Sequence, residues 1–136
     1  MGPDLKRMFV SFAPLIDPGQ LARVKHETNH LEAEICEQAG SPPEFRLVNL
    51  DPGYIALSKL VLATTKDYSH RVYIGEGMYA EATLHWHDGA WRAWPYTYPD
   101  YASDVYHAFF RRVRERLLAQ LGRETSAGGI PRQAEP

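Results

Sequence analysis

Cysteine is almost absent from this sequence, and so are long apolar runs and motifs that fix a function class. With Cys36 as its one cysteine, the chain has neither an internal disulfide framework nor a cysteine-rich metal site. No apolar run approaches the ~20 residues that a membrane-spanning helix needs, and no long apolar stretch follows the first charges as in a secretory signal. We therefore expect a cytoplasmic protein without a membrane partner.

The charge balance and the missing motifs exclude further classes. Lys and Arg number 15 and Asp and Glu number 17, so the formal net charge is -2 at pH 7. A domain that mainly holds nucleic acid usually has a basic excess, so we do not expect nucleic acid as the partner. The sequence also lacks the glycine-rich phosphate loop, the dinucleotide-binding fingerprint and the G-x-S-x-G nucleophile turn.

The composition is sufficient for one hydrophobic core. The chain has 136 residues, 44% of them hydrophobic, and domains most often have ~100–150 residues. We predict a single domain over residues 1–122. Residues 123–136 lack a core pattern and contain a glycine pair and two prolines, which predicts a disordered tail.

Two segments have the spacing of amphipathic helices. The first begins at Asp17-Pro18 and ends before Gly40, and its apolar stripe consists of Leu21, Val24, Thr28, Leu31 and Ile35. The second runs from about Ser103 to Leu121 with Gly122 as its stop signal, and its stripe consists of Tyr106, Phe109, Phe110, Val113, Leu117 and Leu121. Each stripe is expected to face a core.

Strands are predicted for the remaining apolar segments, which are Lys6–Phe12, Phe45–Leu50, Leu60–Ala63 and Arg71–Ile74. The order of the elements predicts an α+β fold, a mostly antiparallel β-sheet with two main helices packed on one face.

The clearest local pattern is a β-hairpin. Apolar and polar residues alternate from Met78 to His87, and Asp88-Gly89 is a favoured type I′ turn. A two-residue turn sets the register, which pairs His87 with Ala90, Trp86 with Trp91, His85 with Arg92 and Leu84 with Ala93. We expect Leu84 and Trp91 on the core face and Glu81 on the opposite face.

The sequence His26-Glu27-Thr28-Asn29-His30 matches the HExxH pattern of zinc peptidases. Two histidines one helical turn apart are chemically suited to hold zinc. The helical wheel, however, places His26 and His30 opposite the apolar stripe, where no cleft would shelter a metal. We therefore predict no metal site.

The last helix is rich in arginine, with Arg111, Arg112, Arg114, Arg116 and Arg123. Such a run either forms a phosphate-facing surface or is a solvated face whose cations lie near a helix C-terminus. We favour the solvated face.

One dense polar segment is the candidate binding site. Residues 64–71 read Thr-Thr-Lys-Asp-Tyr-Ser-His-Arg between two apolar strands. Such a loop is suited to an anion, with Arg71 as a bidentate clamp and Lys66 as a point charge. The alternative is a polar connection whose side chains bond their own backbone.

A long run of the chain resembles a known family. The run NLDPGYIALSKLVLATTKDYSHRVYIGEGMYAEATL, the later YTYPDY and the segment LKRMFVSFAPLIDPGQLARVKHETNHLE are similar to the bacterial and archaeal family catalogued as domain of unknown function 4416. The resemblance covers about residues 1–121. It implies no established activity, although family members are often labelled GTP-binding proteins. It also implies a strand–helix–strand segment before Met1, so we expect a chain that is short at its N-terminus and self-associates through an open sheet edge.

Two hypotheses follow. The first is a small-ligand site, binding or catalytic, for an anionic or phosphate-bearing molecule such as a nucleotide. In it His70 and Glu81 would act as acid and base, and the ligand would be bound by Asp51, Lys66, Asp67, Arg71, Tyr79 and Asp100. The second is a non-enzymatic module that docks a partner protein by its sheet edge or aromatic loop. The sequence names no cofactor and does not decide whether the protein is an enzyme.

Overall fold

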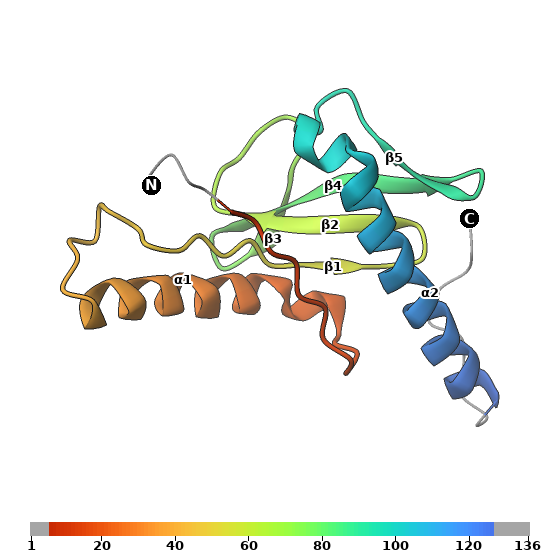
Figure 1. The fold of residues 1–136 in the computed structure, drawn as a ribbon, viewed down its shortest axis with the longest axis horizontal. Coiled ribbons are helices and arrows are strands. Elements are labelled where there is room, and N and C mark those ends of the chain that lie inside the picture. The colour runs from red at the N-terminus through yellow and green to blue at the C-terminus, as the bar shows by residue number, and fades with distance from the viewer. Residues whose placement is uncertain (1–5, 127–136) are drawn as a thin grey trace. The chain divides into compact units, whose positions relative to one another are not determined.

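The computed structural model describes residues 6–126, which form an antiparallel sheet and two main helices (Figure 1). The helices are α1 (Leu21–Gln38) and α2 (Asp104–Ser126), each preceded by a short 3-10 helix, η1 (Pro18–Gln20) and η2 (Pro99–Ala102). The strands are β1 (Gly53–Ile55), β2 (Lys59–Thr64), β3 (Val72–Gly75), β4 (Met78–His87) and β5 (Ala90–Ala93). The predicted α+β class is confirmed.

The sheet has the strand order β1-β2-β4-β3, and β5 also pairs with β4. The long strand β4 therefore has two neighbours on one side, β3 at its beginning and β5 at its end.

By its contacts the chain divides into two compact units, so the single domain over residues 1–122 stays a prediction. The first unit comprises Met1–Pro52 and Ala63–Ala80, and the second comprises Gly53–Leu62 and Glu81–Pro136.

Helix α1 of the first unit begins and ends as its sequence predicts. The Asp17 carboxylate accepts a hydrogen bond from the Gly19 N–H at 2.8 Å, which satisfies one of the free donors at the start of the helical segment. Gly40 has φ of +69°, a left-handed conformation that stops the helix.

The buried face of α1, in contrast, was predicted wrongly. Leu31 and Ile35 of the predicted stripe are exposed, while Lys25, Glu32 and Cys36 are buried. The reason is hydrogen bonding to a segment distant in sequence, since Lys25 and Glu32 both bind the backbone of Leu50. Polar residues are buried when their hydrogen bonds are satisfied, and helical periodicity alone does not report this.

Two predicted strands are also wrong. Lys6–Phe12 and Phe45–Leu50 have no strand structure, and their large apolar side chains Met8, Val10, Phe12, Phe45 and Leu47 are exposed. Alternating apolar residues favour a strand only when a neighbouring strand is available to pair, and neither segment belongs to the described sheet.

The hairpin of the second unit has the predicted register. Leu84 lies opposite Ala93, His85 opposite Arg92, Trp86 opposite Trp91 and His87 opposite Ala90. Asp88 and Gly89 have φ of 49° and 74°, as a type I′ turn requires. Leu84 and Trp91 are buried as expected.

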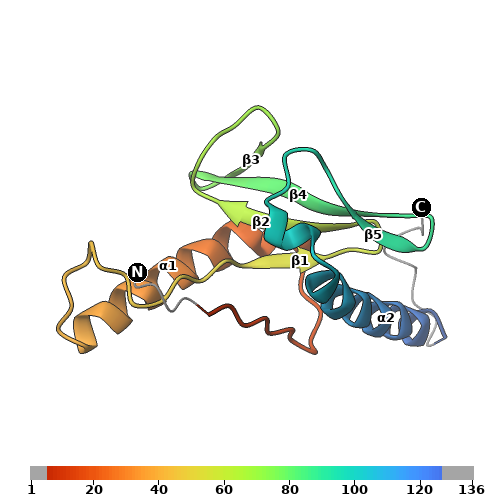
Figure 2. The same cartoon turned by 45° about the horizontal axis from the view of Figure 1, so that its top comes forward.

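The opposite face of β4 is covered as well. Glu81 and Thr83 are buried there, although they were expected on an open polar face. The loop after β5 covers this face, because the Tyr96 hydroxyl donates to Ala82 O at 2.6 Å and the Thr97 hydroxyl donates to Thr83 O at 2.7 Å. That loop leads through η2 into α2 (Figure 2).

Helix α2 packs against β1 and β5 of the second unit. Its predicted stripe is confirmed, with Phe110, Leu117 and Leu121 buried and Tyr106, Phe109 and Val113 half-buried. Two expectations are corrected. The helix continues through Gly122 to Ser126, and Arg114 is buried rather than solvated. The predicted tail beyond residue 126 lies outside the described residues.

Arg114 joins three parts of the second unit. Its side chain is 4% exposed, its Nε donates to Leu57 O at 2.9 Å, and its guanidinium lies 3.9 Å from the centre of the Trp86 ring. Arg111 lies near the same indole at 5.3 Å and donates to Gly89 O at 3.0 Å. Arg111 and Arg114 thus hold the hairpin against α2, and this contact is their structural role.

Strand β1 was missed because it is short and begins with glycine. A Cβ atom on Gly53 would lie 2.3 Å from Val61 O, so only glycine allows β1 to approach β2 this closely.

No helix in the described part of the chain has both the length and the apolar character needed to cross a membrane.

Candidate functional site

The loop between β2 and β3 brings several predicted site residues together in the first unit. Arg71 folds back along the loop, so that its guanidinium donates to Lys66 O at 3.2 Å and lies 4.5 Å from the centre of the Tyr68 ring. A turn supports this arrangement, since the Arg71 N–H donates to Tyr68 O at 2.9 Å. Arg71 is thus held by both the backbone and the side chains of its own loop.

His70 belongs to the same group. Its ring stacks on Tyr68 with the centroids 6.1 Å apart and the planes 5° apart. Tyr68 therefore contacts both Arg71 and His70. At the start of the loop the Lys66 N–H donates to the Thr64 hydroxyl at 3.2 Å, which fixes the backbone while the Lys66 side chain is exposed.

The sequence left two interpretations of this loop open, an anion-binding site and a plain polar connection. Its side chains do bond the loop backbone, as the plain polar-connection reading requires. The same contacts hold the Arg71 guanidinium and the His70 imidazole beside Tyr68, while the anion site itself stays a prediction.

Three other predicted residues also belong to the first unit, and the contacts they make there are different ones. Asp51 accepts from the Asn49 amide at 3.1 Å, and Asn49 in turn accepts from Arg46 at 3.0 Å. Tyr79 packs edge to face on Tyr73 across β3 and β4. Asp67 is an exposed residue of the loop itself.

Glu81 and Asp100 belong to the second unit. Glu81 is buried on β4, where its carboxylate accepts from the Thr83 hydroxyl at 2.9 Å. Burial, and secondarily the charge of Glu81, raises the pKa of the Tyr96 phenol above its usual 10. Asp100 accepts from the Tyr101 N–H at 2.9 Å in η2. The roles assigned to Glu81 and Asp100 stay predictions.

The HExxH histidines are both exposed, as the helical wheel indicates. His26 Nε2 lies 2.7 Å from Glu76 O and forms a hydrogen bond with it, which ties α1 to the turn after β3. Within residues 6–126, no three His, Cys, Asp or Glu side chains are grouped in a way that could hold a metal ion.

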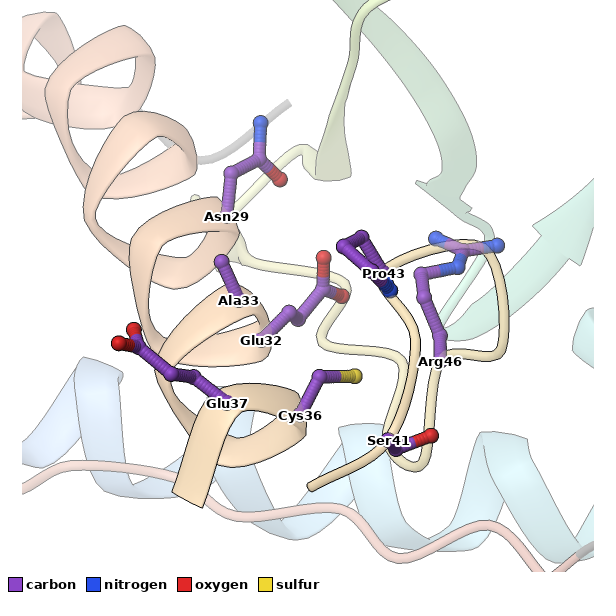
Figure 3. A pocket seen from close by; sticks show the side chains of 8 residues that line it. All are labelled: Asn29, Glu32, Ala33, Cys36, Glu37, Ser41, Pro43 and Arg46. Atoms are coloured by element: carbon purple, nitrogen blue, oxygen red, sulfur yellow. The ribbon is translucent and has the colours of Figure 1, made fainter. Parts of the chain in front are cut away.

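A groove in the first unit was not found from the sequence. It lies between α1 and the segment after it and has a volume of about 550 Å³ (Figure 3). Glu32 and Cys36 lie on the helix side, and Ser41, Pro43 and Arg46 on the other. Sequence reasoning missed it because Glu32 is not part of the apolar stripe from which the buried face of α1 was predicted. The signal that could have found it is the pair Lys25 and Glu32, which are spaced two turns apart and so share a face.

The hairpin in the second unit has its own aromatic group. His85 stacks on Trp94 at 3.8 Å, and burial, followed by the charges of His87 and Arg92, lowers the pKa of His85 below 6.5. This imidazole is therefore kept neutral at pH 7, which suits stacking on an indole.

Comparison with known proteins gives one match. No curated protein and no solved structure matches the chain. The model of the family described as a domain of unknown function, DUF4416, matches residues 1–117. Since that match covers most of the 136-residue sequence, the chain belongs to the DUF4416 family.

Proposed function

We propose that the loop Thr64–Arg71 binds a small anionic molecule, most simply one with a phosphate group. The observation that carries the proposal is the position of Arg71, whose guanidinium is held by Lys66 O and the Tyr68 ring. A guanidinium has five N–H donors in a fork that matches carboxylate and phosphate oxygens. The contacts with Lys66 O and the Tyr68 ring hold this fork in a defined orientation within the loop.

Pre-organisation favours this arginine over the exposed arginines of α2. Ordering a flexible side chain on binding costs ~0.5–1.5 kcal/mol, and a side chain that is already held avoids part of this cost. Lys66 adds a second positive charge from a backbone that is fixed by Thr64. His70, stacked on Tyr68, supplies an imidazole beside the same anion. In this proposal His70 would exchange a proton with the ligand, should the site prove catalytic.

Titration with inorganic pyrophosphate at low and moderate salt tests the proposal. We expect binding that weakens about tenfold or more in Arg71→Ala, because a charge-assisted bidentate contact to phosphate is worth ~1.5–3 kcal/mol. The matched control is Arg112→Ala, which removes an exposed arginine of α2 that lies 5.8 Å from the Phe109 ring. Nucleotides and sugar phosphates in the same assay extend the ligand class.

Equal losses from the two substitutions, or a larger loss from Arg112→Ala, would contradict the assignment. A second variant, Tyr68→Leu, separates charge from pre-organisation. It keeps Arg71 but removes the ring that holds it, so we expect a smaller loss than in Arg71→Ala.

A second candidate function is self-association, which the edge strand β3 favours. Val72 and Tyr73 point to opposite faces of this strand, yet they are 68% and 58% exposed. Proteins usually protect an edge strand with charge, proline or a cover. We propose that β3 pairs with β3 of a second copy, since an antiparallel pair centred between Tyr73 and Ile74 brings Arg71, just before the strand, toward Glu76 of that copy, which lies in the turn just after it.

This charge arrangement gives a sharp test. Arg71→Glu alone and Glu76→Lys alone would each place like charges across the pair, so each variant should be monomeric by light scattering. Mixing the two variants restores opposite charges at both ends, and a heterodimer should form. A monomeric wild-type chain, or no heterodimer in the mixture, would exclude this interface.

A further inference from the structure

The groove between α1 and the segment 41–46 has the dimensions of a small-molecule site. Its volume is about 550 Å³, and its lining consists of Asn29, Glu32, Ala33, Cys36, Glu37, Ser41, Pro43 and Arg46. Pockets for small ligands usually have ~300–1,000 Å³. All lining residues belong to the first unit, and none is part of the loop Thr64–Arg71 proposed above.

Glu32 gives the groove a negative charge that forms no ion pair within residues 6–126. Its side chain is 7% exposed, and its Oε2 accepts from the Leu50 N–H at 2.7 Å. Its other oxygen makes no hydrogen bond or ion pair within the described residues, and Figure 3 shows the carboxylate directed from α1 toward Pro43 and Arg46. This oxygen is open to the groove rather than sealed in the core, since it is not among the buried polar atoms that lack a partner in the described residues. Lys25, the other buried charge of α1, is directed instead to Leu50 O at 3.5 Å.

Arg46 gives the opposite wall a positive charge. Its guanidinium donates to Asn49 Oδ1 at 3.0 Å, and within the described chain it forms no ion pair with Glu32. One of its five donors is therefore used by Asn49. The ring of Pro43 lies between the two charges, and the Cys36 thiol lies beside them on the side of Ser41, where it donates to Phe45 O at 3.6 Å (Figure 3).

From this arrangement we infer that the groove binds a small zwitterion, a molecule with an ammonium group at one end and a carboxylate at the other. The ammonium group would donate to the unpaired oxygen of Glu32, and the carboxylate would accept from Arg46. The short stem between them would lie against Cys36 and Pro43. The groove would thus select a ligand that carries both charges, whereas a simple amine or a simple acid carries only one of them.

A series of linear amino acids tests the inference and measures that distance. Glycine, 3-aminopropionate, 4-aminobutyrate, 5-aminopentanoate and 6-aminohexanoate are titrated by calorimetry, with butylamine and butyrate as single-charge controls. We expect one chain length to bind best and to exceed both controls by about tenfold or more, since each exposed charge pair contributes up to ~1 kcal/mol and a partly buried pair more. Equal binding of butylamine and the best amino acid would overturn the zwitterion, and no binding in the series would overturn the site.

Two variants and one chemical probe locate the binding. Glu32→Gln keeps an oxygen that accepts from the Leu50 N–H but removes the charge, so we expect it to fold and to lose affinity about tenfold; Glu34→Gln, on the exposed face of α1, is its control. Arg46→Gln should lose affinity by a similar factor, with Arg23→Gln as control. Cys36 is the one cysteine and lines the groove, but its side chain is 3% exposed and its thiol donates to Phe45 O at 3.6 Å. Labelling of this thiol by a small methanethiosulfonate is therefore slow and requires the groove wall to open, which a bound ligand opposes.

The labelling experiment separates this site from the proposed anion loop. At ten times Kd of the best amino acid, about 9% of the groove stays free, so labelling should slow about tenfold. Arg71→Ala should show the same protection as the wild type. Binding without protection of Cys36, or a loss of protection in Arg71→Ala, would show that the ligand binds elsewhere.

Discussion

Gly122 gives a direct test of where α2 ends. The sequence indicates a C-terminal stop at this glycine, whereas the structure places it inside a helix that runs to Ser126. A Cβ atom there would have no neighbour within 4 Å. Alanine is favoured over glycine in a helix interior by ~1 kcal/mol, so Gly122→Ala should raise the free energy of unfolding by up to about that amount. For a chain of this length the melting temperature should rise by roughly 3–5 °C.

The same substitution at Gly53 should have the opposite effect. There the new Cβ atom would lie 2.3 Å from Val61 O and 2.7 Å from Leu62 Cδ2, so β1 must move away from β2. Overpacking of this kind costs ~1–3 kcal/mol, and the short strand β1 has no other partner that would restore the pairing. We therefore expect Gly53→Ala to lower the melting temperature by at least the amount that Gly122→Ala raises it.

Urea and thermal unfolding of the two variants beside the wild type provide the measurement. The reasoning is refuted if Gly122→Ala destabilises the protein, because that is the result expected of a left-handed glycine at a helix end. It is equally refuted if Gly53→Ala is as stable as the wild type.

Three further predictions concern the second unit. Leu84 is fully buried, so Leu84→Ala should cost ~3–5 kcal/mol in urea unfolding, and a loss below 1 kcal/mol would show that the hairpin is not part of the core. Burial lowers the pKa of His85 in the folded state, so the unfolded state binds more protons below pH 6.5. The wild type should therefore lose stability relative to His85→Phe as the pH falls from 7.5 to 5. Stability curves that run parallel for the two proteins would argue against this burial. Burial raises the pKa of Tyr96, so the stability that its neutral phenol contributes is present below pH 10 and lost above it. The wild type should be more stable than Tyr96→Phe by about 1 kcal/mol, because its hydroxyl donates to Ala82 O, and this difference should shrink above pH 10. A difference that grows above pH 10 would contradict the assignment.

The parts of the fold that could be predicted from the sequence depend on local chemistry. The type I′ turn at Asp88-Gly89 fixes the register of β4 and β5, and Asp17 and Gly40 mark the ends of the first helical segment. These signals are complete within a few residues, so no knowledge of distant partners is needed.

The parts that failed depend on partners that are distant in sequence. Lys6–Phe12 has strand periodicity but no strand to pair with in the described sheet. The face of α1 follows Lys25 and Glu32 because both bind Leu50, and Arg114 is buried because it binds Leu57 O and Trp86. For Lys25, Glu32 and Arg114 a specific long-range hydrogen bond outweighs the apolar pattern.

The candidate site shows the same division. Lys66, His70 and Arg71 are close in sequence, and the structure brings them together in one loop. Asp51 was grouped with them by composition, but it bonds Asn49 instead. The groove was not anticipated because its charges, Glu32 and Arg46, are brought together by the turn after α1.

The most direct test of the central claim is a backbone-amide NMR titration of the labelled protein with inorganic pyrophosphate. If the loop Thr64–Arg71 binds the anion through Arg71, the amide signals of residues 66–71 should shift with a saturable dependence, and those shifts should disappear in Arg71→Ala. Saturable shifts at Arg111, Arg112 and Arg116 of α2 with none in the loop, or no saturable shifts at all, would contradict the account.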